Sequence, residues 1–184
     1  DTVNYDSDGA VISADVTAGG REQTIEIRLS RSRRKELFIN GVKKKSAADF
    51  AGTVRAVLFC PGDLDIIREG ASERRRFLDM CISQLRPRYA EALAKFSKAY
   101  EEKTRILRDS EEKPSLLEFL DEYDRHLAVL SAELIHYRAG FIAALSPIAA
   151  EIHRDFSGGS EELTLRYKTV STVTDPLLPA SELV

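Results

Sequence analysis

Three consecutive arginines, Arg74 to Arg76, follow Ser72 at the start of a segment with helical periodicity. Ser72 is a favourable N-cap residue, so the arginines occupy the first turn of the expected helix. Positive charge is unfavourable there, because a helix N-terminus itself carries a partial positive charge. Arginine binds carboxylates and phosphates through two parallel hydrogen bonds. The triplet therefore predicts such a contact with another element, and the alternative is a solvated helix face with a local pair such as Arg75–Asp79.

A second group of charged residues lies between Arg21 and Lys45. This stretch holds nine basic and three acidic residues, a local charge of +6, whereas the whole chain carries −3. Basic residues at hairpin ends are typical of surfaces that contact a nucleic-acid backbone. The same residues on edge strands discourage aggregation, and the sequence favours the two interpretations about equally. The residues predicted to bind DNA are Arg31, Arg33, Arg34, Lys35, Lys43, Lys44 and Lys45.

The sequence contains none of the motifs that ordinarily mark a catalytic centre. The phosphate-binding motif GxxxxGK[ST], HExxH and GxSxG are absent, and the three histidines lack the spacing of metal ligands. Residues 156–160, FSGGS, are similar to the LSGGQ motif of ABC-type ATPases. That motif must begin a helix, whose N-terminus faces phosphate, whereas the residues that follow here alternate as a strand. We therefore interpret the two glycines as a helix stop and expect no catalytic or metal-binding residue in this chain.

The first third of the chain is predicted to form antiparallel strands. Residues 10–16 and 24–29 alternate apolar and polar side chains with period two, which is strand spacing. Residues 36–42, ELFINGV, predict a strand that ends in a type I′ turn at Asn40-Gly41. Residues 54–59, VRAVLF, are nearly all apolar, which predicts a strand that needs cover on both faces. We expect this cover to be incomplete, so that apolar surface is exposed.

Helical periodicity follows Pro61-Gly62. The apolar residues predict one helix from Ser72, a second from Pro87, and a third from Leu116 with spacings of four and three. The third would span roughly 60 Å at about 1.5 Å per residue, enough to fold back along the others as an antiparallel hairpin. Residues 162–170, ELTLRYKTV, return to period two and predict a strand that re-enters the sheet. This order indicates an α+β chain in which a helical lobe is inserted into a sheet domain.

The composition is that of an ordinary globular protein. Of 184 residues, 43% are hydrophobic and 31% are charged, and the net charge of −3 argues against a bulk polycation. No uninterrupted apolar run approaches the length of a membrane span and no signal peptide is visible, so we expect a cytoplasmic protein without a membrane partner. Cys60 and Cys81 are expected to be reduced core residues. The chain begins at Asp1 and its one methionine is Met80, so we expect a piece of a longer protein.

Residues 58–79, LFCPGDLDIIREGASERRRFLD, resemble the signature of the RecF proteins of bacterial recombinational repair. The matching residues are Pro61, Asp63, Leu64, Ile66, Ile67, Arg74, Arg75, Phe77, Leu78 and Asp79. Gly62 departs from the usual acidic residue, and the turn Glu69-Gly70-Ala71 replaces Gly-x-Pro. The resemblance extends from about Ala10 to Lys168 through ELFINGV, YDRHLA, the long helix with Arg138, Phe141, Leu145 and Pro147, and HRDFSGGSEELTLRY.

This resemblance implies both a fold and a set of ligands. RecF proteins resemble ABC-type ATPases related to SMC proteins, which implies an α/β ATPase lobe, with ATP and Mg²⁺ as cofactors of the full-length protein. It also implies an ATP-dependent homodimer that binds DNA at single-strand/double-strand junctions and acts with RecR, RecO and RecA in gap repair and the SOS response. Because the phosphate loop of such proteins lies before this segment, we expect the chain itself neither to bind a cofactor nor to hydrolyse ATP.

By the same resemblance the chain divides into four parts. Residues 1–60 correspond to the β-rich part of the first ATPase lobe, 61–71 to a connector similar to the Q-loop, 72–157 to a helical second lobe, and 158–184 to a return strand and tail. Asp63 is the candidate nucleotide contact, although relatives with a Q-loop usually carry Gln there. The residues predicted to couple the lobes, with at least one arginine paired to a carboxylate across them, are Pro61, Arg74, Arg75, Arg76 and Asp79.

Two functions remain open for this segment. One is a DNA-contacting module that uses the hairpins between Arg21 and Lys45. The other is a lobe-coupling or protein-docking helical module of an SMC-like ATPase, with no direct DNA contact. Salt dependence separates them, because phosphate contacts weaken steeply with salt and apolar docking does not.

Overall fold

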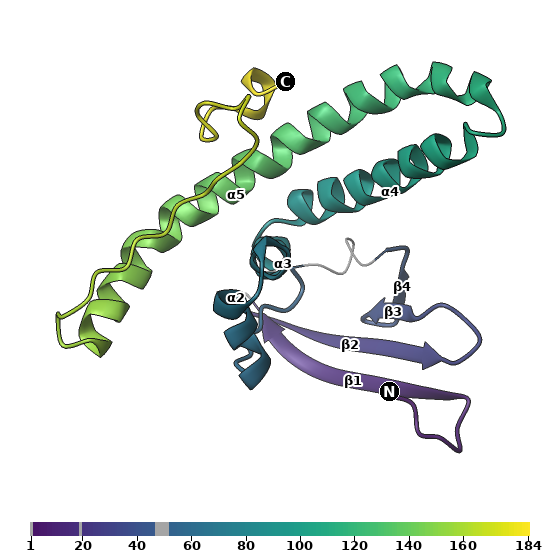
Figure 1. Ribbon diagram of the computed structural model, residues 1–184. Coiled ribbons are helices and arrows are strands. Elements are labelled where there is room, and N and C mark those ends of the chain that lie inside the picture. Colours follow the sequence, from purple (N-terminus) through teal and green to yellow (C-terminus); the bar gives the residue numbers. More distant parts are fainter. Residues whose placement is uncertain (1, 19, 47–51) are drawn as a thin grey trace.

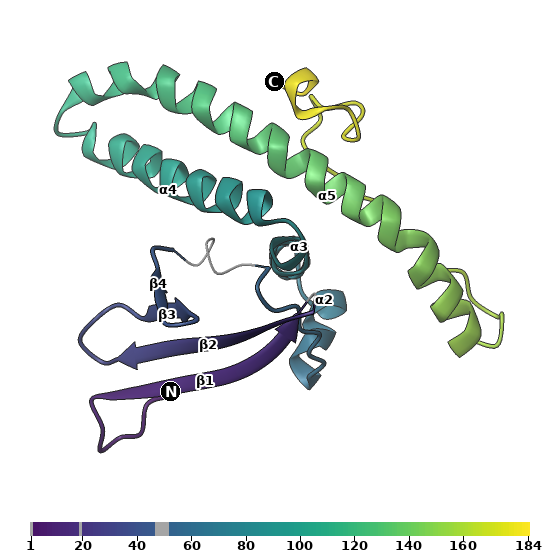
Figure 2. The ribbon, with the colours of Figure 1, turned by 180° about the vertical axis from the view of Figure 1, so that it is seen from behind.

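The chain forms a four-stranded sheet and a helical lobe whose two long helices lie above the sheet in Figures 1 and 2. The computed structural model describes residues 2–18, 20–46 and 52–184. The strands are β1 (Gly9–Ala18), β2 (Arg21–Ser30), β3 (Glu36–Ile39) and β4 (Val42–Lys44). The longer helices are α3 (Ala71–Leu85), α4 (Pro87–Asp109) and α5 (Leu120–Phe156). Shorter helical segments are η1 (Pro61–Leu64), α2 (Asp65–Arg68), η2 (Pro114–Phe119) and η3 (Ala180–Glu182).

The sheet is an antiparallel meander in the order β1-β2-β3-β4. Ile12 pairs with Ile27, which in turn pairs with Leu37, so these apolar side chains share one face. The opposite face carries charged residues such as Glu26 and Arg28. The period-two pattern predicted these strands and the side that each residue takes, and the structure confirms both.

The turn between β3 and β4 has the backbone that its sequence predicts. Asn40 and Gly41 have φ values of 50° and 74°, the left-handed region that a type I′ turn needs at both central positions. The Asn40 side chain accepts a hydrogen bond from the Thr24 N–H at 2.8 Å, and the Asn40 N–H donates to the Thr24 carbonyl at 2.8 Å. These bonds tie the turn to β2, and the two-residue turn itself sets the β3–β4 register in which Lys44 lies opposite Leu37.

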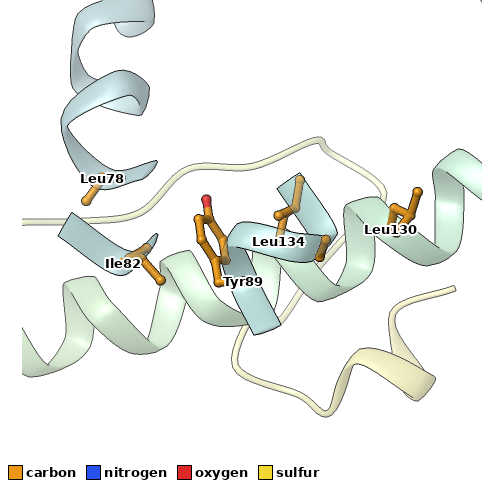
Figure 3. Close-up of a cluster of buried hydrophobic side chains, with 6 residues drawn as sticks. Leu78, Ile82, Tyr89, Leu130 and Leu134 are labelled. Atoms are coloured by element: carbon orange, nitrogen blue, oxygen red, sulfur yellow. The ribbon is translucent and has the colours of Figure 1, made fainter. Parts of the chain in front are cut away.

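Helices α3, α4 and α5 meet in one apolar core (Figure 3). Tyr89 of α4 is fully buried and Ile82 of α3 is 2% exposed, and both lie among leucines of α5 that include Leu130 and Leu134. Full burial of one such aliphatic side chain contributes about 1.5–3 kcal/mol. This core holds α4 and α5 together as the predicted antiparallel hairpin, with α3 packed across its open end (Figure 1).

Residues 54–59 do not form the strand that their apolar sequence predicts. They have no regular secondary structure, and Val57, Leu58 and Phe59 are 102%, 82% and 83% exposed. A strand exists only where a neighbouring strand accepts its backbone hydrogen bonds, and the described residues offer none to this segment. The Ala56 N–H instead donates to Gln84 Oε1 of α3 at 2.7 Å. The expected exposure of apolar surface is confirmed.

The predicted return strand at 162–170 is also absent. This segment runs in extended form along α5 (Figures 1 and 2), and the Leu165 N–H donates to Ser146 Oγ at 3.3 Å. Its alternation survives as alternating exposure, because Leu163, Leu165 and Tyr167 are half-buried and the residues between them are exposed. The alternating pattern therefore reflects an extended segment with one half-buried side, and that side packs against α5 and not against a sheet.

Helix α5 is apolar enough to resemble a membrane span. The helical stretch Pro114–Phe156 contains an 18-residue window with a mean hydropathy of 1.3, which meets the length and composition of a crossing helix. The sequence-based expectation counted uninterrupted apolar runs and did not detect this window. Leu130, Leu134 and Ala139 of this helix are buried in the core of the helical lobe, but only 33% of the window is buried.

The two cysteines differ in environment, although both were expected in the core. Cys60 is exposed, which corrects that expectation, whereas Cys81 is half-buried and its burial raises the pKa of its thiol. Because the thiolate is the reactive form, we expect iodoacetamide at pH 8 to modify Cys60 well before Cys81. Mass spectrometry of Cys60→Ser and Cys81→Ser variants checks this. Equal rates in the two single-cysteine variants would contradict the assignment.

Candidate functional site

Five predicted DNA-binding residues gather at one end of the sheet. Arg33, Arg34 and Lys35 form the exposed loop between β2 and β3. The β3–β4 register sets Leu37 opposite Lys44, which brings Lys44 and Lys45 back beside that loop. None of these five side chains makes a hydrogen bond or ion pair with another residue in the described ranges. They form a group of positive charge, which we call the basic end of the sheet, and an acidic neighbour among the described residues is Glu36, whose pKa Arg33 helps to lower.

The other two predicted DNA-binding residues have internal partners. Arg31 donates from Nε to the Ser7 carbonyl at 2.9 Å and from Nη2 to the Asn4 carbonyl at 3.0 Å, which fastens the N-terminal turn to the end of β2. Lys43 forms an ion pair with Glu36, and this contact lowers the pKa of the Glu36 carboxyl. Sequence spacing predicted positive charge at both positions but not these partners. Their charge is less available to phosphate than that of the basic end.

The connector, residues 61–71, consists of η1, α2 and a short link to α3. Asp63 Oδ2 accepts a hydrogen bond from the Cys60 N–H at 2.7 Å, so this carboxylate closes the start of η1. Pro61 is the first residue of η1, where its lack of an N–H removes no helical hydrogen bond. Asp63 thus has a local structural partner, and its predicted nucleotide contact stays a prediction.

Among the described residues, the arginine triplet pairs with no carboxylate of another element, which corrects the expectation for Arg74 to Arg76. Arg74 Nη1 donates to the carbonyl oxygens of Ile66 at 3.2 Å and Glu69 at 3.1 Å. Arg76 forms an ion pair with Glu73 of its own helix, with 3.5 Å between Nη1 and Oε2. The Arg76 side chain is 83% exposed. Side chains in a first helical turn point back toward the preceding segment, so carbonyls of the connector are within reach. Arg75 is exposed, without an ion pair to any described residue.

Asp79 pairs with a residue that local spacing did not indicate. Its Oδ1 accepts hydrogen bonds from Arg138 of α5, at 2.9 Å from Nε and 2.7 Å from Nη2. The Tyr89 hydroxyl of α4 donates to the same oxygen at 2.5 Å and accepts from Arg138 Nε at 2.9 Å. The alternative pair with Arg75 is therefore not formed. Asp79, Tyr89 and Arg138, which we call the three-helix network, join all three long helices.

Burial makes this network electrostatically strong. The side chains of Asp79 and Arg138 are only 21% and 14% exposed, next to apolar Leu78 and Ile82. Burial raises the pKa of the Tyr89 hydroxyl, and its hydrogen bond to Asp79 raises it further. Burial alone would lower the pKa of Arg138, but the contacts with Tyr89 and Asp79 outweigh it and the net shift is upward. The Tyr89 hydroxyl therefore stays protonated and the Arg138 guanidinium stays charged throughout the neutral range.

Known proteins are similar in sequence to this chain along most of its length. No protein-family model matches the chain. The DNA replication and repair protein RecF of Acetivibrio thermocellus is 33% identical over 165 residues, which are 90% of this chain and 45% of the relative. The protein of the same name from Lachnospira eligens is 33% identical over 175 residues, 94% of this chain and 48% of the relative. The chain belongs to the RecF family.

Solved RecF structures have the same fold as the chain. A structure of the recombination mediator protein RecF-ATPrS in the RecFOR pathway is 27% identical, covers 85% of this chain and superposes with a TM-score of 0.77. A structure of RecF-ATP in the same pathway is 28% identical, covers 83% and has a TM-score of 0.71. The antiparallel sheet and helical lobe are thus the architecture of the matching part of RecF. The chain spans about half the length of the curated RecF relatives that it matches.

Within this RecF segment, the sequence signature and the three-helix network meet at Asp79. Asp79 ends the matched run RRRFLD, and Arg138 lies in the long-helix pattern that also resembles RecF. The sequence did hold a signal for the pair of Asp79 and Arg138, because each is a charged residue among the apolar positions of a predicted helix. Buried charges in proteins are paired, so two such residues could have been predicted to meet. Tyr89 gave no such signal, because an aromatic residue at helical spacing ordinarily indicates only core.

Proposed function

We propose that this chain is the DNA-contacting part of a RecF protein that acts in DNA replication and repair. The observation that carries the proposal is the basic end of the sheet, where five cationic side chains lie together without an ion pair to any described residue. Lysine and arginine without an ion pair on a hairpin end favour a polyanion, because phosphate contacts release condensed counterions. The names of the relatives, DNA replication and repair protein RecF, support the same ligand.

The ligands and partners of the whole protein are part of this proposal. The solved RecF-ATP and RecF-ATPrS structures support ATP binding by the full-length protein, and we propose Mg²⁺ with it. We further propose an ATP-dependent homodimer in the cytoplasm that binds single-strand/double-strand junctions. Its partners would be RecO and RecR, with RecA loading in recombinational gap repair and the SOS response as the outcome. The RecFOR pathway named for the solved structures supports the link to RecO and RecR.

A second candidate function rests on the connector. Arg74 holds two connector carbonyls, and Asp79 on the same helix is joined to α4 and α5. This continuity favours a lobe-coupling role for Pro61, Arg74 and Asp79, with Asp63 as the proposed nucleotide contact. The role requires no contact between this chain and DNA, so the two candidates make different predictions.

Fluorescence anisotropy of a labelled gapped DNA across a salt series separates the two functions. If the five residues of the basic end contact phosphate, the logarithm of the association constant falls with the logarithm of salt at a slope of roughly −4 to −5. ATP should leave this binding unchanged, because the chain contains no GxxxxGK[ST] motif. Absence of binding at low salt would reject the DNA-contacting function for this segment and favour the coupling function.

A further inference from the structure

Among the described residues, the hydrogen bonds that attach the connector to the helical lobe come from α3. Arg74 of α3 binds the carbonyls of Ile66 and Glu69, and Gln84 of α3 accepts from the Ala56 N–H. Among the described residues, the segment 54–70 makes no other hydrogen bond or ion pair outside itself. No residue of η1 or α2 is buried, so apolar packing does not hold the connector in place either.

Helix α3 is itself anchored at only one end. Its buried residues, Leu78 and Ile82, lie at its midpoint and in its second half, and most of its first turn is exposed. Asp79 stands where the anchored half begins, about 7.5 Å along the helix from Arg74 at 1.5 Å per residue. A rotation or tilt of α3 at this point would therefore displace the connector as a rigid arm.

The apolar contacts of α3, from Phe77, Leu78 and Ile82, leave the rotation of the helix less well determined than directional bonds would, because apolar side chains tolerate repacking. A charged pair with several hydrogen bonds is directional and loses them if the helix turns. Asp79 Oδ1 receives three donors, two from Arg138 and one from Tyr89. Buried ion pairs add little stability over apolar residues of similar volume, and specifying one arrangement is a role that such a pair can serve.

We infer that Asp79, Tyr89 and Arg138 are positioning residues, which set the orientation of α3 on the α4–α5 hairpin and thereby place the connector relative to the helical lobe. This positioning role requires neither DNA nor nucleotide. It deepens the coupling function proposed above, since any movement of the connector would reach α5 through this network.

The test measures where the connector lies, with the chain as it is. Spin labels on the exposed Cys60, which directly precedes the connector, and on Glu101→Cys in α4 report the distance from the start of the connector to the hairpin. Cys81→Ser removes the second native thiol. In the parent chain we expect one narrow distance distribution by electron–electron double resonance. In the triple variant Asp79→Leu/Tyr89→Phe/Arg138→Met, which leaves no buried hydroxyl without a partner, the apolar residues should maintain the melting temperature, while the distribution shifts and broadens.

Two further variants separate a loss of α3 positioning from a general loosening of the helical lobe. Arg138→Lys retains the charge but not the two-pronged contact, so it should fold and also broaden the distribution. A label pair within the hairpin, Glu101→Cys and Ala128→Cys in a Cys60→Ser/Cys81→Ser background, should be unaffected by either change. An unaltered Cys60 distribution in folded Arg138→Lys would overturn the inference, as would equal broadening of the hairpin pair, which indicates general loosening.

Discussion

Replacing Leu134 with alanine is expected to lower the free energy of unfolding by about 2–5 kcal/mol. Leu134 is 3% exposed and belongs to the cluster in which α5 meets Ile82 and Tyr89. Its truncation removes apolar contacts from all three helices at once and leaves a cavity that the surrounding helices fill only in part. Urea denaturation followed by circular dichroism at 222 nm measures the loss, since most of the ellipticity comes from α3, α4 and α5.

Ile152→Ala on the same helix is the matched control. Ile152 is 51% exposed and lies beyond the core, so the expected change is within roughly 0.5 kcal/mol. The helix-propensity effects of the two substitutions differ by only a few tenths of a kcal/mol, roughly the difference between leucine and isoleucine. An equal loss of stability in the two variants would mean that the core does not lie where α3, α4 and α5 meet.

The triple substitution Arg33→Ser/Arg34→Ser/Lys35→Ser is expected to reduce DNA affinity by more than about tenfold at low salt. These residues form the exposed loop of the basic end and have no described partner, so their removal breaks no internal contact. The loss of three phosphate contacts should also flatten the salt dependence by roughly three units of slope. Anisotropy with the same gapped DNA measures both quantities.

Arg105→Ser/Arg108→Ser/Lys113→Ser is the control for charge. It also removes three positive charges, but from exposed positions near the far end of the helical hairpin. We expect this variant to bind DNA nearly as the parent does. Equal losses in the two triple variants would assign the effect to net charge, and no loss in the first would place the DNA contacts away from the basic end.

Local patterns determined much of the fold. The alternation at residues 10–16 and 24–29 predicted β1 and β2, since side chains on a strand point to opposite faces whatever surrounds it. Asn40-Gly41 determined its turn through the conformations that these residues tolerate. Helical spacing likewise predicted α3, α4 and α5, because helical hydrogen bonds lie within the segment itself.

The same reasoning was wrong where a strand needs a partner. Residues 54–59 and 162–170 have strand sequences, but a strand satisfies its backbone only through a neighbour that lies far away in the chain. The first segment stays exposed at Leu58 and Phe59, and the second lies along α5. The alternating or apolar pattern of each segment is a local property of its sequence, whereas pairing in a sheet depends on a distant partner strand.

The functional residues divide in the same way. The sequence by itself determined that positive charge concentrates between Arg21 and Lys45, and that Asp79 belongs to a RecF-like signature. Only the tertiary structure decided which charges are compensated: Arg31 holds the N-terminal turn, Lys43 pairs with Glu36, and Asp79 meets Arg138 across 59 positions of sequence. Side-chain charge is a property of the residue, whereas an ion pair depends on distance in space, which the packing of the helices and the register of the strands establish.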